Sequence, residues 1–160
     1  MVVSDAIIQI MQTPPHESFE LLSGTLLVSG MSDEQIRVLA ACGKQEIYTD
    51  GQPLVTRSDE AFDLLIVLSG KCEIRTEMND LLYRLGADSL IGEVSFLDGK
   101  TRSANAIASG DCTAMRFPAT LLDDLEASRP DIVAKLLKNL GVVLCQKLRS
   151  TTRFAEASFV

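Results

Sequence analysis

Short apolar segments separated by turn signals fill the middle of this chain, between Gly43 and Pro118. The signals are residues that favour tight reversals of the backbone: Asp50-Gly51, Ser69-Gly70, Asn79-Asp80, Gly86, Asp98-Gly99 and Gly110-Asp111. Segments this short are typical of antiparallel strands joined by hairpins, and about eight of them fit in this stretch. The pattern therefore predicts a mainly β domain built as an antiparallel roll or barrel.

Two segments show how the strands should be buried. Residues 71–77 alternate strictly, with Cys72, Ile74 and Thr76 on one face and charged side chains on the other. Residues 63–68 instead carry a run of apolar side chains, which predicts a strand buried on both faces. The first strand should border solvent, and the second should lie in the middle of the fold.

Helical patterns flank the strands on both sides. Ser32 and Gln35 have the spacing of a capping box at the start of a short helix, which Gly43 ends. Pro118 is placed to begin a second short helix, and Pro130 a long one. The long helix carries an apolar stripe at four-residue intervals: Ile132, Leu136, Leu140, Leu144 and Leu148. The order is helix, strands and then C-terminal helices.

The chain reads as one domain with a short extension. Its length of 160 residues and hydrophobic content of 46% suit a single core. The Pro14-Pro15 pair interrupts any helix near the N-terminus, so residues 1–20 are expected to form a loosely attached extension and residues 21–160 the domain. The apolar run at residues 6–11 lacks a basic flank and the length of a membrane span, so no membrane insertion is expected.

Composition argues against several classes of partner and chemistry. A net charge of −7 and 5% aromatic residues disfavour binding to DNA or RNA, which relies on an excess of Lys and Arg and on stacking platforms. The four cysteines form no C-x-x-C pair and are expected to be core residues in a reduced, cytoplasmic protein: Cys42, Cys72, Cys112 and Cys145.

The single histidine bears on catalysis. His16 lies in the Pro-rich N-terminal stretch, whereas a metal-dependent enzyme built on a β-roll would need several histidine ligands. No Ser-His-Asp or Cys-His set can be assembled among the strands either. We therefore expect no metal site, no cofactor, no catalytic residue and no enzyme activity.

The most informative segment is residues 86–104, Gly86-Ala-Asp-Ser-Leu-Ile-Gly92-Glu93-Val-Ser-Phe-Leu-Asp-Gly99-Lys-Thr-Arg102-Ser103-Ala104. It predicts a strand end, a Gly-Glu pair opening one short helical turn, a loop and a return strand. A helix N-terminus beside a glycine offers free backbone N–H groups to a phosphate, and an arginine on the return strand can add a fork-shaped contact. Glu93 only accepts hydrogen bonds, so it suits a hydroxyl such as a ribose 2′-OH.

The run G-E-V-S-F-L, a short loop and then R-S-A resembles the phosphate-binding cassette of the cyclic-nucleotide-binding domain family, the sensor domain of the catabolite activator protein and the protein kinase A regulatory subunit. The resemblance extends over roughly residues 21–153, with further matches at residues 50–55, 64–70 and 129–131. It implies a double-stranded β-helix, a jelly-roll-like β-roll, between a short N-terminal helix and C-terminal helices.

The resemblance also implies roles for individual residues. Gly92 and the following amides would meet the cyclic phosphate or ribose, Glu93 the ribose 2′-OH, and Arg102 the exocyclic phosphate oxygens. The full set of ligand-binding residues that it implies is Gly92, Glu93, Val94, Ser95, Arg102, Ser103, Ala104, Ile74, Leu82 and Ile91. Ile74, Leu82 and Ile91 would form the apolar wall, and the last turns of the C-terminal helix offer base contacts: Lys147, Ser150, Thr151 and Thr152.

Two hypotheses follow from this reading. The first is a non-catalytic regulatory module that binds a cyclic mononucleotide, cAMP favoured over cGMP, and signals to a separate downstream protein. Only twelve residues follow Leu148, too few for the DNA-binding domain that transcription-factor members append, so we expect a standalone sensor. The second hypothesis is a nucleotide-free interaction module on the same fold, or a homodimer formed through the C-terminal helix.

Overall fold

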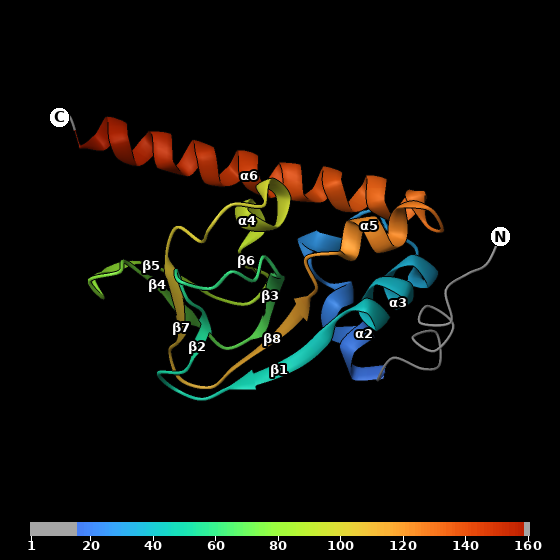
Figure 1. The fold of residues 1–160 in the computed structure, drawn as a ribbon, viewed down its shortest axis with the longest axis horizontal. Coiled ribbons are helices and arrows are strands. Elements are labelled where there is room, and N and C mark those ends of the chain that lie inside the picture. The colour runs from blue at the N-terminus through green and yellow to red at the C-terminus, as the bar shows by residue number, and fades with distance from the viewer. Residues whose placement is uncertain (1–15, 159–160) are drawn as a thin grey trace.

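The computed structural model describes residues 16–158 as a β-roll flanked by helices (Figure 1). The elements follow the order α2(His16–Ser23), η1(Leu26–Val28), α3(Asp33–Cys42), β1(Lys44–Tyr48), β2(Pro53–Val55), β3(Leu64–Ser69), β4(Cys72–Arg75), β5(Leu81–Leu85), β6(Leu90–Ile91), α4(Glu93–Asp98), β7(Asn105–Ala108), β8(Cys112–Phe117), α5(Leu121–Glu126) and α6(Pro130–Ala157). This is the helix, strand and helix order that the sequence predicts.

The strands form two four-stranded antiparallel sheets. One sheet has the order β1-β8-β3-β6 and the other the order β2-β7-β4-β5. Strands that are distant in sequence pair across the roll, as β3 does with β8, where Leu65 lies opposite Arg116. These pairings confirm the mainly β fold with the topology of a roll rather than a simple meander.

Strand β3 separates two hydrophobic cores. Leu64, Ile66 and Leu68 pack on the helical side of the sheet with residues of α2, α3, α5 and α6. Leu65 and Val67 point the other way, into the space between the two sheets. Because successive side chains of a strand point to opposite faces, an unbroken apolar run is what a strand between two cores requires. The predicted burial on both faces is confirmed.

The N-terminal helices cover one end of the roll. Ser32 caps α3 and accepts a hydrogen bond from the Gln35 amide, while the Gln35 side chain accepts one from the Ser32 amide, so the predicted capping box is present. Helix α2 begins at His16 and continues through Leu22, which is fully buried. The domain boundary expected at residue 20 therefore falls inside a helix, and residues 1–15 of that extension lie outside the described part of the chain.

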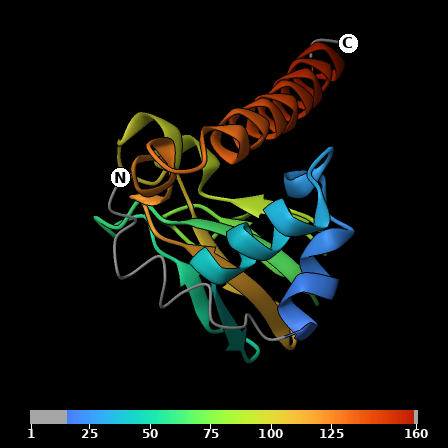
Figure 2. The same cartoon turned by 90° about the vertical axis from the view of Figure 1, so that its right-hand side faces the viewer.

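Helix α6 runs along the whole length of the roll (Figure 1). Its first half is anchored by buried residues such as Leu136 and Leu140 and by Asn139, whose amide donates to the carbonyls of Leu27 and Ser29 at 2.8 and 3.0 Å. Every described residue from Leu148 onward is exposed. Figure 2 shows this half extending away from the body of the domain.

One expectation for α6 is wrong, because Cys145 is exposed rather than part of the core. Leu148 continues the apolar stripe but is 68% exposed. The stripe is longer than the surface that covers it, because η1 contacts α6 at Asn139 and α5 also lies beside the N-terminal half of α6 (Figure 1). Periodicity alone cannot tell a core face from an apolar face left in solvent.

Candidate functional site

Gly92 makes a sharp turn between β6 and α4. The chain leaves the sheet at Ile91, which pairs with Leu65 of β3, and enters the helix at Glu93. Gly92 bridges the two with φ of +80°, in the left-handed region that side chains disfavour. A β-carbon at this position would also lie 1.7 Å from Nη1 of Arg102. Both the conformation and the close approach of the guanidinium require glycine here.

The Arg102 guanidinium is buried and only partly satisfied. The residue is 4% exposed, and its Nη2 donates to the backbone oxygen of Asp63 at 2.8 Å. Its Nε and Nη1 have no hydrogen-bond partner within residues 16–158. Burial lowers the pKa of this guanidinium, although the group stays charged at physiological pH. A buried cation with unused donors is costly unless an anion completes it, so the arrangement suits a bound oxyanion.

A pocket of about 200 Å³ lies in front of Arg102. One wall is polar and comes from the turn at Gly92 and the first turn of α4, where the helix leaves amide groups without helical partners. The other wall is largely apolar. The lining residues are Val55, Ile74, Tyr83, Leu85, Leu90, Ile91, Gly92, Glu93, Val94, Ser95, Arg102, Ser103, Ala104, Asn105, Ala106 and Lys147. The pocket can hold a ligand with an anionic end and an apolar side.

Glu93 and Lys147 form an ion pair on the edge of this pocket. Nζ of Lys147, on α6, lies 2.7 Å from Oε1 of Glu93 and donates to the Leu90 carbonyl at 3.1 Å. The Glu93 side chain is 5% exposed and the Lys147 side chain 35%. A carboxylate this buried needs a cation or strong donors, and α6 supplies the cation. The pair joins the C-terminal helix to the first turn of α4.

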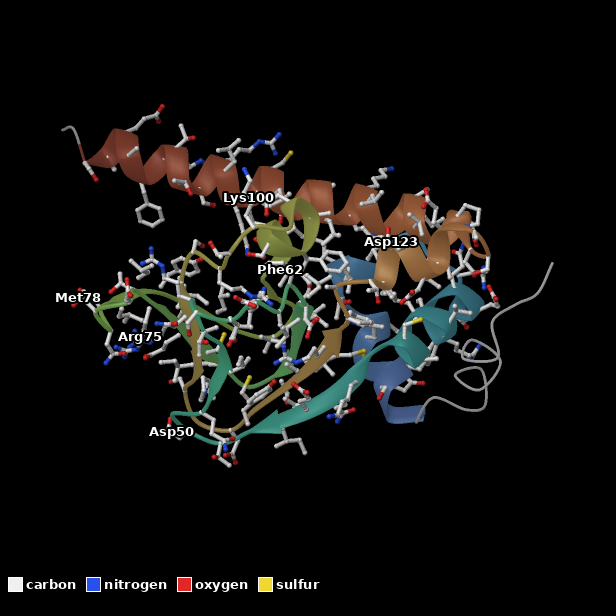
Figure 3. The ribbon with its side chains drawn as sticks, viewed as in Figure 1. Asp50, Phe62, Arg75, Met78, Lys100 and Asp123 are labelled. Carbon is white, nitrogen blue, oxygen red and sulfur yellow. The ribbon has the colours of Figure 1, made fainter. Side chains whose placement is uncertain are left out.

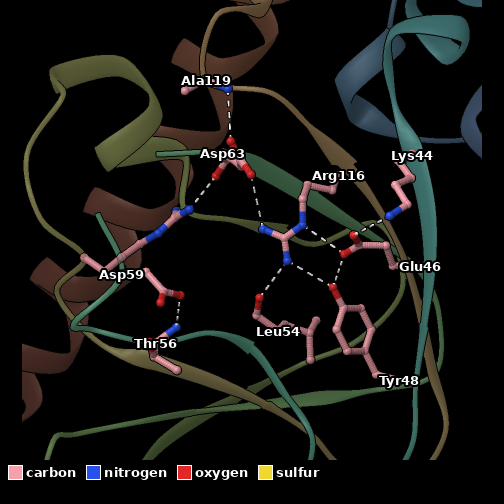
Figure 4. A network of polar contacts seen from close by, with 10 residues as sticks. Lys44, Glu46, Tyr48, Leu54, Thr56, Asp59, Asp63, Arg116 and Ala119 are labelled. Atoms are coloured by element: carbon pink, nitrogen blue, oxygen red, sulfur yellow. Dashed lines mark hydrogen bonds and ion pairs between the residues drawn. The ribbon is translucent and has the colours of Figure 1, made fainter. Parts of the chain in front are cut away.

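Asp63 anchors Arg102 to the sheet. Its backbone oxygen accepts from Arg102, while its carboxylate accepts from the Ala119 amide at 3.1 Å and from Arg116 at 3.5 Å. Figure 4 shows Asp63 between these partners. Arg116 also donates to Glu46 at 2.9 Å and to Tyr48 at 3.1 Å, which ties β8 to β1. The acceptor that orients the Arg102 guanidinium is thus itself held by a polar network.

Nine of the ten predicted ligand-binding residues line the pocket. They are Gly92, Glu93, Val94, Ser95, Arg102, Ser103, Ala104, Ile74 and Ile91. Leu82, the tenth, is 53% exposed and lies outside the pocket. Tyr83 pairs with Ile74 in the strand register and shares its face, so the pocket receives Tyr83 while Leu82 points to the opposite side.

The four candidates for base contacts separate in the structure. Lys147 reaches the pocket wall beside Glu93. Ser150, Thr151 and Thr152 are exposed, and each hydroxyl donates to the carbonyl four residues earlier in α6. Sequence reasoning placed Lys147 with the base and missed its pairing with Glu93, as well as the roles of Asp63 and Arg116. No local pattern marks these contacts, since they join residues 39 to 54 positions apart.

Within residues 16–158, His, Cys, Asp and Glu side chains nowhere gather in threes in a way that could hold a metal ion. In the same part of the chain, no helix is both long enough and apolar enough to cross a membrane.

The solved structures include close matches to this fold. A cyclic nucleotide-binding domain from Methylobacillus flagellatus has a TM-score of 0.81 and 25% identity, with 89% of this chain and 84% of that chain covered. The Thermus thermophilus catabolite activator protein has a TM-score of 0.70 and 25% identity over 83% of this chain and 62% of that chain. Both confirm the β-roll with flanking helices.

Sequence comparisons lead to the same family. The chain is 31% identical to the cyclic AMP receptor protein of Thermus thermophilus, over 80% of this chain and 59% of that protein. It is 28% identical to Glutaminase 1 of Bradyrhizobium diazoefficiens, over 83% of this chain and 21% of that protein. It thus spans from about a fifth to about three fifths of these relatives. The family model described as "Cyclic nucleotide-binding domain" matches residues 45–129, more than half of the chain. The chain belongs to the cyclic-nucleotide-binding domain family.

Proposed function

We propose that this domain is a non-catalytic regulatory module that binds a cyclic mononucleotide, with cAMP favoured over cGMP. The observation that carries the proposal is the Arg102 guanidinium, 4% exposed and with Nε and Nη1 unpartnered within the described residues. Arg102 lines a pocket that has both a polar and an apolar wall. A singly charged cyclic phosphate supplies the acceptors that Arg102 lacks.

The remaining parts of a cyclic nucleotide fit the other walls. The amides at the start of α4 would complete the phosphate site, Glu93 would accept the ribose 2′-OH, and the apolar side with Ile74 and Val55 would receive the base. The preference for cAMP is supported by the relative named as a cyclic AMP receptor protein, which is 31% identical to this chain. The non-catalytic role is supported by the same receptor-type relatives.

Helix α6 is the candidate output element. Ligand binding at the Gly92 turn would shift the equilibrium between two positions of α6. The free energy of this shift cannot exceed the difference between the ligand's binding free energies for the two positions. The exposed apolar residues Leu137, Leu148 and Phe154 give α6 a surface for a downstream protein or for a second copy of the chain. The unpaired thiols of all four cysteines are consistent with a cytoplasmic setting.

Calorimetric titration with cAMP and cGMP tests the proposal. We expect binding of cAMP by the wild-type protein and a loss of at least about tenfold in affinity for Arg102→Ala, because the phosphate loses its charged partner. Arg153→Ala, an exposed arginine on α6, is the matched control and should bind as the wild type does. Absence of binding to either nucleotide at millimolar concentration would favour the nucleotide-free interaction module instead.

A further inference from the structure

We propose that Lys147 reads the ribose 2′-hydroxyl together with Glu93, so that the ion pair selects a ribonucleotide over its 2′-deoxy analogue. The inference rests on the proposed function and adds a specificity residue from α6 to it. In this arrangement the hydroxyl donates to the Glu93 carboxylate and accepts from the Lys147 ammonium.

The geometry leaves Lys147 with a donor to spare. An ammonium group carries three N–H donors, and two of them are directed to Oε1 of Glu93 and to the Leu90 carbonyl, at 2.7 and 3.1 Å. No third partner is present within residues 16–158, and Lys147 lines the pocket. Glu93 also lines the pocket and accepts from Lys147 through one of its two carboxylate oxygens. An acceptor and a donor therefore stand side by side at the pocket wall.

A hydroxyl is the group that such a pair recognises. It donates one hydrogen bond and accepts others, so one 2′-OH satisfies both members, whereas the hydrogen of a deoxyribose satisfies neither. The penalty for a missing hydroxyl is large when the protein groups are desolvated, and Glu93 is 4% exposed. With Glu93 alone the discrimination would come from one hydrogen bond, and with Lys147 it comes from two.

Lys147 also connects the pocket to α6. Among the described residues of α6, Lys147 alone lines the pocket, and it does so at the start of the exposed half of the helix. A ligand that carries the hydroxyl therefore contacts the helix through this one side chain. The 2′-OH would be the part of the nucleotide that α6 senses directly.

Calorimetric titrations of the full chain with cAMP and with 2′-deoxy-cAMP test the inference. We expect the wild type to prefer cAMP by at least about tenfold. In Lys147→Met this ratio should fall by at least about threefold, because the second hydrogen bond is gone. Lys138→Met removes an exposed lysine from the same helix and should keep the wild-type ratio, as should Lys147→Arg, which retains charge and donors.

The outcomes separate this inference from the proposed function. If the wild type binds neither nucleotide, both fail. If it binds cAMP but Lys147→Met keeps the wild-type ratio, Lys147 only holds α6 in place and the inference is overturned while the proposed function stands. Should Lys147→Met unfold below the assay temperature, Lys147→Leu, which also carries no donor, is titrated in its place with the same expected fall in the ratio.

Discussion

The backbone of Gly92 lies so close to Arg102 that a β-carbon on it would be 1.7 Å from Nη1 of the guanidinium. A side chain at position 92 would therefore clash with the guanidinium in its present position. In the proposed function this contact matters for the ligand, because the packing that buries Arg102 at the pocket wall leaves its Nε and Nη1 without partners among the described residues.

Gly92→Ala should destabilise the domain and weaken nucleotide binding at least about tenfold, because it combines a strained φ with a clash. Gly110→Ala is the control for φ alone, since Gly110 has φ of +74° and no atom within 4 Å of an added β-carbon. It should lose about 1 kcal/mol of stability and keep its affinity.

Gly141→Ala, in the interior of α6, should raise the free energy of unfolding by about 0.5–1 kcal/mol, because no atom lies within 4 Å of the added β-carbon and alanine favours the helix.

These three variants are compared by urea unfolding and by titration with cAMP. Equal loss of affinity in Gly92→Ala and Gly110→Ala would contradict the role given to the contact with Arg102. A wild-type affinity in Gly92→Ala would contradict it as well.

Arg116→Met should lower the free energy of unfolding by about 2–3 kcal/mol, because it leaves the carboxylates of Glu46 and Asp63 without their guanidinium partner. Affinity for cAMP should fall too, since Asp63 then orients Arg102 less well (Figure 4). Urea unfolding and calorimetry measure the two effects. Lys44→Met provides the control: its side chain is 80% exposed and 3.8 Å from Glu46, and its removal should cost less than about 0.5 kcal/mol.

Glu46 should make stability depend on acid pH. Burial raises its pKa, but hydrogen bonds from Tyr48 and Arg116 outweigh this effect and hold the pKa below its ordinary value. A carboxylate with a lowered folded-state pKa stabilises the fold above its unfolded pKa and loses this contribution as pH falls through the folded value. Unfolding of wild type and Glu46→Gln, followed from neutral pH to about pH 3, should therefore show a stability difference that shrinks on acidification. A difference that is constant with pH would contradict this.

The cysteines should differ in their reactivity toward iodoacetamide. Cys145 is exposed on α6, whereas Cys72 is buried, and burial raises its pKa to about 12. Burial also raises the pKa of Cys112. Because the thiolate is the reacting species, intact-mass analysis should show one rapid modification in the native protein and none in Cys145→Ser. Rapid modification of Cys72 before unfolding would show that the core opens there.

The exposed surface near the β4–β5 hairpin is a feature that the sequence did not predict. Figure 3 shows Arg75 and Met78 at this tip, on the side of the roll that faces the C-terminal half of α6. Met78 is 84% exposed and Leu81 40%. The alternation in residues 71–77 correctly predicted one buried face for β4, but it carried no information about the next strand, since β5 is an edge strand whose side chains are mostly exposed.

The local sequence determined much of this protein. The capping box of α3, the unbroken apolar run of β3, the glycine turn at Gly92 and the start of α6 at Pro130 are each set by neighbours within a few residues, and each was predicted. The local sequence was sufficient to predict these features, because capping, alternation and backbone conformation depend on residues close together in the chain. The nine pocket residues that were correctly grouped come from the cassette or from alternation in adjacent strands.

Only the tertiary structure decided the rest. The partners of Glu93, Arg102 and Arg116 come from segments distant in sequence, namely Lys147, Asp63 and Glu46. Likewise, the face of α6 that meets the core and the point where it enters solvent depend on where η1 and α5 lie. Contacts of this kind leave no periodic signal, because a side chain chosen for a remote partner has the same local preferences as one chosen for solvent.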